Sequence, residues 1–201
     1  MLLSATCPIC GGPGGAPCAR CTSMLRAAPP LPPPPDVDRC LALLSFEGLA
    51  ADLVAGIKYR NERAPLPGIG RALAALAGAV GGGGASAVTW IPTTTARRRD
   101  RGFDHAQLLA RHVARALGLP LHRLLVREGG PPQTGRGRQE RLSGPRMRPA
   151  RRVGGLVLAV DDVVTTGATA SAAAGALRAA GAGEVWVLAA ARRGPQGCRG
   201  G

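Results

Sequence analysis

The fold of this chain is decided by residues 155–169, which read GLVLAVDDVVTTGAT. Residues 156–160 form an uninterrupted, partly β-branched apolar run, which predicts a central parallel strand buried on both faces. Asp161 and Asp162 would then follow the carboxyl end of that strand, where open α/β sheets bind their ligands. Carboxylates at this point can accept hydrogen bonds from the vicinal hydroxyls of a ribose.

The turn that follows the two carboxylates supplies donors. Thr165, Thr166 and Thr169 offer hydroxyls, and Gly167 lets a ligand approach the backbone closely. The backbone N–H groups of this turn begin a small-residue helix predicted over residues 170–180, so they can hold a dianionic phosphate. The alternative is an ordinary strand–turn–helix with threonine caps, which requires neither a second carboxylate nor a cluster of hydroxyls.

The same stretch resembles the phosphoribosyltransferase signature, which has four apolar, two acidic and two apolar residues followed by Thr-Thr-Gly-Ala-Thr or a close variant. The match covers the whole signature. The resemblance implies a type I phosphoribosyltransferase-like α/β fold that binds phosphoribosyl pyrophosphate (PRPP) with Mg²⁺. It places Asp161 and Asp162 on the ribose 2′- and 3′-hydroxyls, and it surrounds the 5′-phosphate with Thr165, Thr166, Gly167, Ala168 and Thr169.

Length and charge narrow the setting. The 201 residues suffice for one medium domain and a small appendage. The formal charge of +14 should attract polyanions or phosphorylated molecules, although the abundance of Ala, Gly, Arg and Pro suggests GC-rich coding and weakens this argument. No segment approaches the ~18 apolar residues of a membrane span, and residues 1–6 lack the features of a secretory signal, so we expect a cytoplasmic protein without membrane insertion.

Two CxxC knuckles lie near the N-terminus, CPIC at 7–10 and CARC at 18–21. Four thiolates from such knuckles close a tetrahedral structural Zn²⁺ site with no open position for catalysis. The predicted ligands are Cys7, Cys10, Cys18 and Cys21; a redox-active or metal-free knuckle is the alternative. Cys40 is predicted to be a buried small hydrophobe, and Cys198, in the Gly-rich tail, has no expected role.

Composition divides the chain into segments. We expect a zinc knuckle over 1–28, a Pro-rich linker over 29–37, the main domain over 38–193 and a disordered tail over 194–201. Strands are predicted at 40–46, 88–91, 156–160 and 185–190, and helices at 49–59, 66–80, 104–117 and 170–180, with a loop at 81–84 and Asp104 as an N-cap. Alternating strands and helices argue for a parallel sheet covered on both faces.

An arginine-rich loop at 97–101 leads into RGFDHAQLLA at 101–110. Here the chain resembles the ComF-like proteins, a branch that includes competence and gluconate-utilisation relatives. Members carry a four-cysteine knuckle, a Lys-Tyr/Phe-Arg step, an arginine-rich loop before Arg-Gly-Phe-Asn-Gln, a Pro-Gln-x-Gly loop and the PRPP signature. All five occur here in that order, but Asp104 and His105 replace the usual Asn-Gln and Thr94 stands where a His is common.

The reaction implied by the resemblance is displacement at ribose C1 with pyrophosphate leaving, which requires Mg²⁺ and cationic donors. Lys58 is the single lysine among 25 arginines, which suggests either that a compact ammonium is needed there or that a surface lysine ends a helix by chance. The candidate donors are Lys58, Arg97, Arg99 and Arg101, with Arg136, Arg138 and Arg141 on a loop over 128–149 that could close as a lid. His105 is expected to be a solvated neighbour more often than a general base.

Three functional hypotheses follow. The chain is a phosphoribosyltransferase acting on an unidentified amine or nucleobase, or it is a PRPP-sensing module without turnover. The third hypothesis, which the ComF resemblance suggests, is an accessory protein of DNA uptake that contacts single-stranded DNA or DNA-uptake proteins. Single-strand platforms normally add aromatic stacking, and Trp90 and Trp186 are predicted to serve the core, which leaves few aromatic side chains for DNA.

Overall fold

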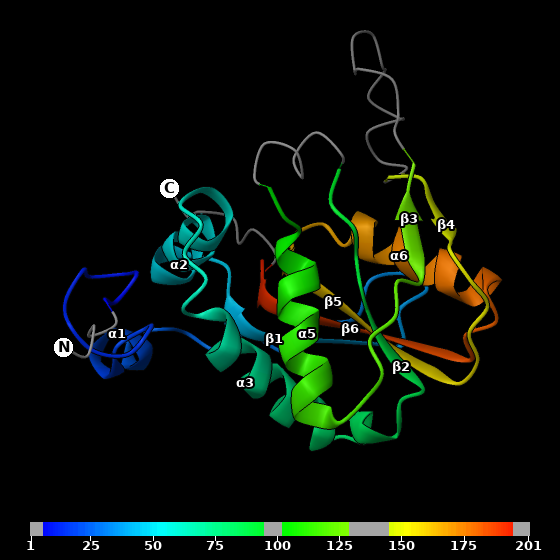
Figure 1. The fold of residues 1–201 in the computed structure, drawn as a ribbon, viewed down its shortest axis with the longest axis horizontal. Helices are drawn as coiled ribbons and strands as arrows, with labels where there is room; N and C mark the ends of the chain where they lie inside the picture. The colour runs from blue at the N-terminus through cyan, green and yellow to red at the C-terminus, as the bar shows by residue number, and fades with distance from the viewer. Residues whose placement is uncertain (1–5, 95–101, 129–144, 195–201) are drawn as a thin grey trace, which may run out of the picture.

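The computed structural model describes residues 6–94, 102–128 and 145–194 (Figure 1). Its main sheet has four parallel strands in the order β1-β6-β5-β2. The bounds are Arg39–Ser45 for β1, Ala87–Trp90 for β2, Leu156–Val164 for β5 and Glu184–Arg192 for β6. The α/β class with a parallel sheet, predicted from the alternation of apolar runs and helical patterns, is thereby confirmed.

Helices cover both faces of the sheet (Figure 1). One face packs against α2 (Gly48–Tyr59), α3 (Leu66–Gly78) and α5 (His105–Leu117). The other face packs against α6 (Ala168–Ala179) and a small antiparallel hairpin of β3 (Leu125–Arg127) and β4 (Met147–Pro149). The shorter elements are α1 (Ala19–Ser23) and the 3₁₀ turn η1 (Gly82–Gly84).

Strand β6 shows why the sheet needs cover on both sides. Trp186, Leu188 and Ala190 enter the core under α3 and α5, whereas their neighbours Val185, Val187 and Ala189 enter the core under α6. Successive side chains of a strand point to opposite faces, so a strand that is apolar throughout is stable only between two layers. This is the arrangement predicted for the central strands.

Both outer edges of the sheet are covered within the described residues. Beside β1, the Ala28 N–H donates to the Leu43 carbonyl at 3.0 Å, and the Ser45 N–H donates to the Arg26 carbonyl at 2.9 Å. Beside β2, the His122 N–H donates to the Val88 carbonyl at 2.9 Å. These hydrogen bonds satisfy backbone N–H and C=O groups at the edges of the sheet, which would otherwise be able to pair with a strand of another chain.

Several elements differ from the sequence-based expectations. Strand β5 continues to Val164 rather than ending at residue 160, because its pairing with β6 continues, with Asp161 opposite Ala189 and Val163 opposite Ala191. The two carboxylates therefore lie inside the strand instead of after it. Helix α6 begins at residue 168 rather than 170. Strand β4 occupies the end of the loop expected over 128–149, and it pairs with β3, which lies just before that loop. No described helix is long and apolar enough to cross a membrane.

The close contact of α3 with α5 generates a stability prediction. A Cβ at Gly70 would lie 2.3 Å from the His112 Cβ, so Gly70→Ala should force the two helices apart and lower the free energy of unfolding by about 1–3 kcal/mol. Gly68, in the same helix, has no neighbour within 4 Å, so Gly68→Ala is the matched control and should be neutral or stabilising by up to about 1 kcal/mol. Urea denaturation measures both. Equal stability of the two variants would contradict the packing argument.

Candidate functional site

The candidate site is built around the carboxyl-terminal end of β5. Asp161 and Asp162 are consecutive strand residues, so their side chains leave the backbone toward opposite faces of the sheet. The Asp162 carboxylate forms an ion pair with the Lys58 ammonium of α2, with Oδ1 and Nζ 2.9 Å apart and both side chains 21% exposed. The Asp162 N–H donates to Asp161 Oδ1 at 2.8 Å, which couples the two residues.

The end of α2 fixes the position of Lys58. The Gly56 carbonyl accepts from both the Arg60 N–H at 3.0 Å and the Glu62 N–H at 3.2 Å, and Asn61 adopts the left-handed conformation with φ 57°. The Arg60 guanidinium and the Glu62 carboxylate pair at 2.8 Å over Gly56, where a Cβ would collide with both. Lys58 is thus held in the last helical turn and directed at Asp162, rather than extending freely into solvent.

Asp104 joins the connection after β2 to the start of α5. Its Oδ1 accepts from the Ala106 N–H at 3.2 Å, which confirms the predicted N-cap. Its Oδ2 accepts from the Thr93 N–H at 3.1 Å, so the same carboxylate also holds the chain that leaves β2. Asp104 is 5% exposed. A local capping signal in the sequence therefore marks a residue that also ties two segments of the site together.

A cation–aromatic contact links the α2–α3 connection to the start of α5. The Arg63 guanidinium lies 3.8 Å from the centre of the Phe103 ring, and its Nε donates to Asn61 Oδ1 at 2.8 Å. The Phe103 ring in turn packs edge-on against the His105 ring at 4.7 Å. His105 is 4% exposed and its ring packs against Phe103, so the expectation that it is a solvated neighbour is wrong.

Burial controls the charge of this carboxylate group. Loss of hydration raises the pKa of Asp161 to about 8, and the negative charges of Asp162 and Asp104 act in the same direction. The Asp162 backbone N–H and the Lys58 ammonium oppose the rise. Burial also raises the pKa of Asp104, against the hydrogen bonds that it accepts. A ligand that brings a cation or hydroxyl donors would favour the ionised form of Asp161.

The turn between β5 and α6 presents polar groups to solvent. Thr165 and Thr166 are exposed, and Gly167 adopts the left-handed conformation with φ 82° immediately before the first residue of α6. The first N–H groups of a helix have no partner within it, so they are available to an anion. The Ala168 N–H lies 3.4 Å from Thr166 Oγ1, and Pro34 fills the space that a Cβ on Gly167 would need.

The structure brings together Lys58, Asp161 and Asp162, and it places the threonine turn directly after the same strand. The other predicted cationic residues lie outside the described residues, and these are Arg97, Arg99, Arg101, Arg136, Arg138 and Arg141. Cys198 lies outside them as well. Sequence reasoning missed the contacts of Arg63 and Pro34, because each joins segments that are far apart in the chain and no local pattern marks it.

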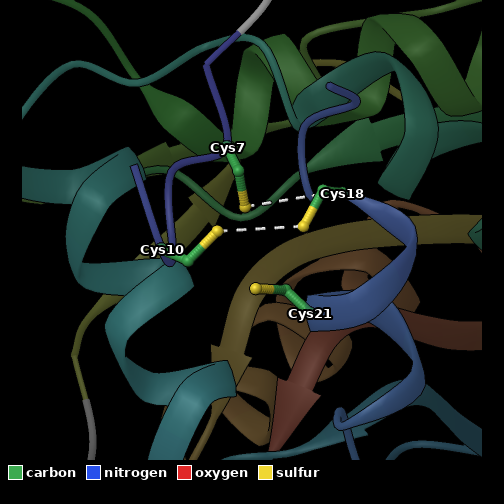
Figure 2. A group of neighbouring side chains, drawn as sticks. All are labelled: Cys7, Cys10, Cys18 and Cys21. Atoms are coloured by element: carbon green, nitrogen blue, oxygen red, sulfur yellow. Dashed lines mark hydrogen bonds between the residues drawn. The ribbon is translucent and has the colours of Figure 1, made fainter. Parts of the chain in front are cut away.

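The four N-terminal cysteines converge on one point (Figure 2). Their sulfurs all lie within 4.8 Å of one another, and the Cys10 and Cys18 sulfurs are 3.8 Å apart. Tetrahedral Zn²⁺ with Zn–S bonds of about 2.3 Å separates its ligands by ~3.8 Å, so the donor set and its spacing fit this ion. The clustering predicted from the two CxxC knuckles is confirmed. Cys40, in β1, is half-buried and lies apart from this group.

The surroundings of the four cysteines favour a thiolate at Cys7, whereas burial and the neighbouring cysteines raise the pKa of Cys21 to about 12. Backbone N–H groups of Cys10 and Cys18 lower the pKa of Cys7, and the Cys18 N–H lies 3.4 Å from the Cys7 sulfur. Cys7 and Cys21 are buried, at 1% and 4% exposed, whereas Cys10 is exposed. Ile9, between Cys7 and Cys10, and Leu25, which follows α1, pack against the core under α2 and α3. The four-cysteine module is therefore attached to the main domain through apolar contacts.

Comparison with known proteins adds little beyond this geometry. No family model and no curated protein matches the chain. Among solved structures, the chain is similar to the allosteric regulatory enzyme of purine biosynthesis, with 24% identity and a TM-score of 0.43. It is also similar to glutamine PRPP amidotransferase from B. subtilis complexed with ADP and GMP, with 25% identity and a TM-score of 0.41. Both similarities cover 62% of this chain and 25% of the other, so function must be argued from the site itself.

The cysteine cluster leads to a metal-content prediction. Protein purified without chelator should contain about one equivalent of zinc, because four thiolates close one tetrahedral site. Cys7→Ser/Cys10→Ser should lose the metal, and Cys40→Ser, which changes a cysteine outside the cluster, should keep it. Elemental analysis after dialysis measures all three proteins. Full zinc retention in the double variant would refute the ligand set.

The raised pKa of Asp161 predicts a pH-dependent stability. Between about pH 4, where an unfolded aspartate releases its proton, and about pH 8, the folded protein retains a proton that the unfolded chain has lost. The contribution of Asp161 to the free energy of unfolding therefore falls as pH rises through this interval. Urea denaturation at pH 5 and pH 8 should show a smaller decline for Asp161→Asn than for the wild type. Exposed Asp52→Asn should retain the wild-type decline; an unchanged slope in Asp161→Asn would contradict the assignment.

Proposed function

We propose that this chain is a type I phosphoribosyltransferase-like protein that binds PRPP with Mg²⁺ and transfers the phosphoribosyl group to an unidentified amine or nucleobase. The observation that carries the proposal is the continuity of β5, the threonine turn and α6. Along this path, two carboxylates are followed by the N-terminal N–H groups of a helix at the carboxyl edge of a parallel sheet. Ligands of open α/β sheets bind at this edge.

The two ends of a ribose 5-phosphate match the two parts of this path. Asp161 and Asp162 offer acceptors for the ribose 2′- and 3′-hydroxyls, and the residues from Thr165 to Thr169 offer hydroxyl and backbone donors to the 5′-phosphate. Asp162 Oδ1 already contacts a cation, the Lys58 ammonium, at 2.9 Å, so the site holds a positive charge beside one of its two carboxylates.

Displacement at ribose C1 breaks the bond to pyrophosphate, so negative charge grows on the leaving group while the sugar becomes positive. Mg²⁺ bound with PRPP would neutralise part of the charge on the pyrophosphate. Among the protein's own groups, Lys58 lies at the site and can donate to an anionic oxygen. Arg101, with Arg97 and Arg99, completes the proposed set of donors, because the connection to which they belong leaves β2 beside β5.

The ComF-like resemblance suggests two other functions, a PRPP sensor and a single-strand DNA platform. A PRPP sensor would use the same carboxylates and turn but release no pyrophosphate. A single-strand DNA platform would need exposed aromatic faces. Trp186 is 4% exposed. Arginine guanidinium groups lie over three of the aromatic rings: Arg39 over Trp186, Arg63 over Phe103 and Arg193 over Phe46. Tyr59, 74% exposed, is adjacent to Lys58. A single exposed aromatic side chain does not favour the DNA function.

Calorimetry tests the proposal directly. PRPP with Mg²⁺ should bind the wild type, and Asp161→Asn/Asp162→Asn should weaken binding at least tenfold (~1.4 kcal/mol), because hydrogen bonds from ribose hydroxyls to charged acceptors are lost. Asp52→Asn makes the same chemical change on an exposed face of α2 and should leave the affinity unchanged. A site that merely attracts anions would instead bind more tightly once the negative charge of these carboxylates is removed, and that result would refute ribose recognition.

Turnover needs a separate readout. Pyrophosphate release from PRPP, measured with a panel of amines and nucleobases, should identify an acceptor for a transferase. Binding without release for any acceptor would favour the sensor over the enzyme.

A further inference from the structure

We propose that the Pro-rich segment 31–34 is a strap that holds the turn between β5 and α6 in its binding conformation, with Pro34 as the positioning residue. This inference rests on the proposed function, in which that turn holds a sugar phosphate. From composition, the segment is expected to be a spacer between the four-cysteine module and the main domain. In the structure, its carbonyls accept from Arg192 of β6, and Pro34 packs against the turn at Gly167.

The first attachment is a buried arginine. Arg192 ends β6, opposite Val164, the last residue of β5 before the turn, and it is 9% exposed. Its Nη1 donates to the Leu31 carbonyl at 3.1 Å and its Nη2 donates to the Pro32 carbonyl. A buried guanidinium needs acceptors, and proline-rich chain offers carbonyls that no local N–H competes for. Arg192 therefore fixes the strap beside the start of the turn.

The second attachment is the contact of Pro34 with Gly167. Pro34 is buried, and its Cβ and Cγ both lie 2.8 Å from the position that a Cβ on Gly167 would take. Gly167 has φ 82°, a conformation that residues with a side chain rarely adopt. Glycine is therefore required here for two reasons, the positive φ and the space that the Pro34 ring occupies. The missing side chain makes room for the proline ring on one side of the turn. The glycine conformation directs the N–H groups that begin α6.

The third attachment follows Pro34 directly. The Val37 N–H donates to the Pro34 carbonyl at 3.2 Å. The Asp38 carboxylate accepts from the Val185 N–H of β6 at 2.7 Å, and it also forms an ion pair with Arg178 of α6. The Arg178 Nε also donates to the Asp36 carbonyl at 3.4 Å. The strap is thus anchored before Pro34 on β6 and after Pro34 on both β6 and α6. Because the chain is anchored both before and after Pro34, the Pro34 ring limits the movement of the turn.

The consequence is pre-organisation. Glycine at a positive φ has many accessible conformations, and ordering it on binding costs free energy that weakens affinity. A proline ring with a fixed φ packed against it restricts those conformations before the ligand arrives. Pro34 touches neither the carboxylates nor the phosphate in this account. Its effect should appear only for ligands that use the turn.

The linker itself provides the matched controls. Pro33 and Pro35 flank Pro34 in the same run and are exposed. Pro33→Ala, Pro34→Ala and Pro35→Ala each remove one ring, so they change the stiffness of the linker similarly, but only Pro34→Ala removes ring atoms at Gly167. We expect Pro34→Ala to bind PRPP and ribose 5-phosphate roughly fourfold more weakly, as for the loss of one buried methylene, the Cγ at Gly167. The two controls should bind like the wild type.

Pyrophosphate is the discriminating probe. It lacks the 5′-phosphate, so its affinity should be unchanged in Pro34→Ala if the proline acts through the turn, and it should fall together with the others if the variant is merely less folded. Arg192→Lys keeps the charge but loses the planar fork that spans two carbonyls, and it should show the same selective loss. Equal ribose 5-phosphate affinity in all these proteins would overturn the strap, and so would a parallel loss for pyrophosphate.

Amide hydrogen exchange separates this inference from the proposed function. If the wild type binds neither PRPP nor ribose 5-phosphate, the proposed function fails. The strap would still predict faster exchange at residues 167–171 in Pro34→Ala than in Pro33→Ala or Pro35→Ala. If the wild type binds both ligands and exchange at 167–171 is the same in all three variants, the strap alone is refuted.

Discussion

The rest of the structure depends on the parallel pairing of β5 with β6, which continues from Leu156 opposite Glu184 to Val164 opposite Arg192. Partner β2 pairs only as far as Trp90 opposite Val160, so β5 extends past it and carries Asp161 and Asp162 along its last paired residues. Because β5 stays paired with β6 over these residues, its side chains keep a fixed alternation. The candidate site lies along this last part of β5, at the carboxyl edge of the sheet.

Electrostatics at this edge follow from the same geometry. The alternation of side chains along β5 directs Asp162 toward α2, where it pairs with Lys58. Asp161 and Asp104 lie close enough to Asp162 for the negative charges to repel one another. Lost hydration and the neighbouring negative charge of Asp162 favour the protonated form of Asp161, whose pKa is raised to about 8. A ligand that supplies hydroxyl donors and a divalent cation would relieve this repulsion. The site is thus chemically suited to a hydroxylated anion bound with metal.

The N-terminal part of the chain belongs to the same body. Residues 26–28 cover the edge of β1, the linker carbonyls bind Arg192, and Pro34 packs on Gly167. The four-cysteine module stands at the start of this path and contacts the core through Ile9 and Leu25. Proline serves here because its carbonyl remains an acceptor while its ring resists bending, so a segment without regular structure is still held in place.

The sequence by itself determined the features that depend on neighbours along the chain. These include the buried strand over 156–160, the Asp104 cap, the clustering of four cysteines and the parallel α/β class, since periodicity, capping and CxxC spacing are local. The sequence pattern predicted that the strand ends at residue 160, because the two residues that follow are charged. In the structure the strand continues to Val164, because its pairing with β6 outweighs the polarity of the two aspartates. Only the tertiary structure decided that Lys58 meets Asp162, that Arg63 covers Phe103 and that Pro34 fills the space at Gly167. Each of these contacts depends on strand order and register, which arise when distant segments bury their apolar faces together and which no local pattern specifies.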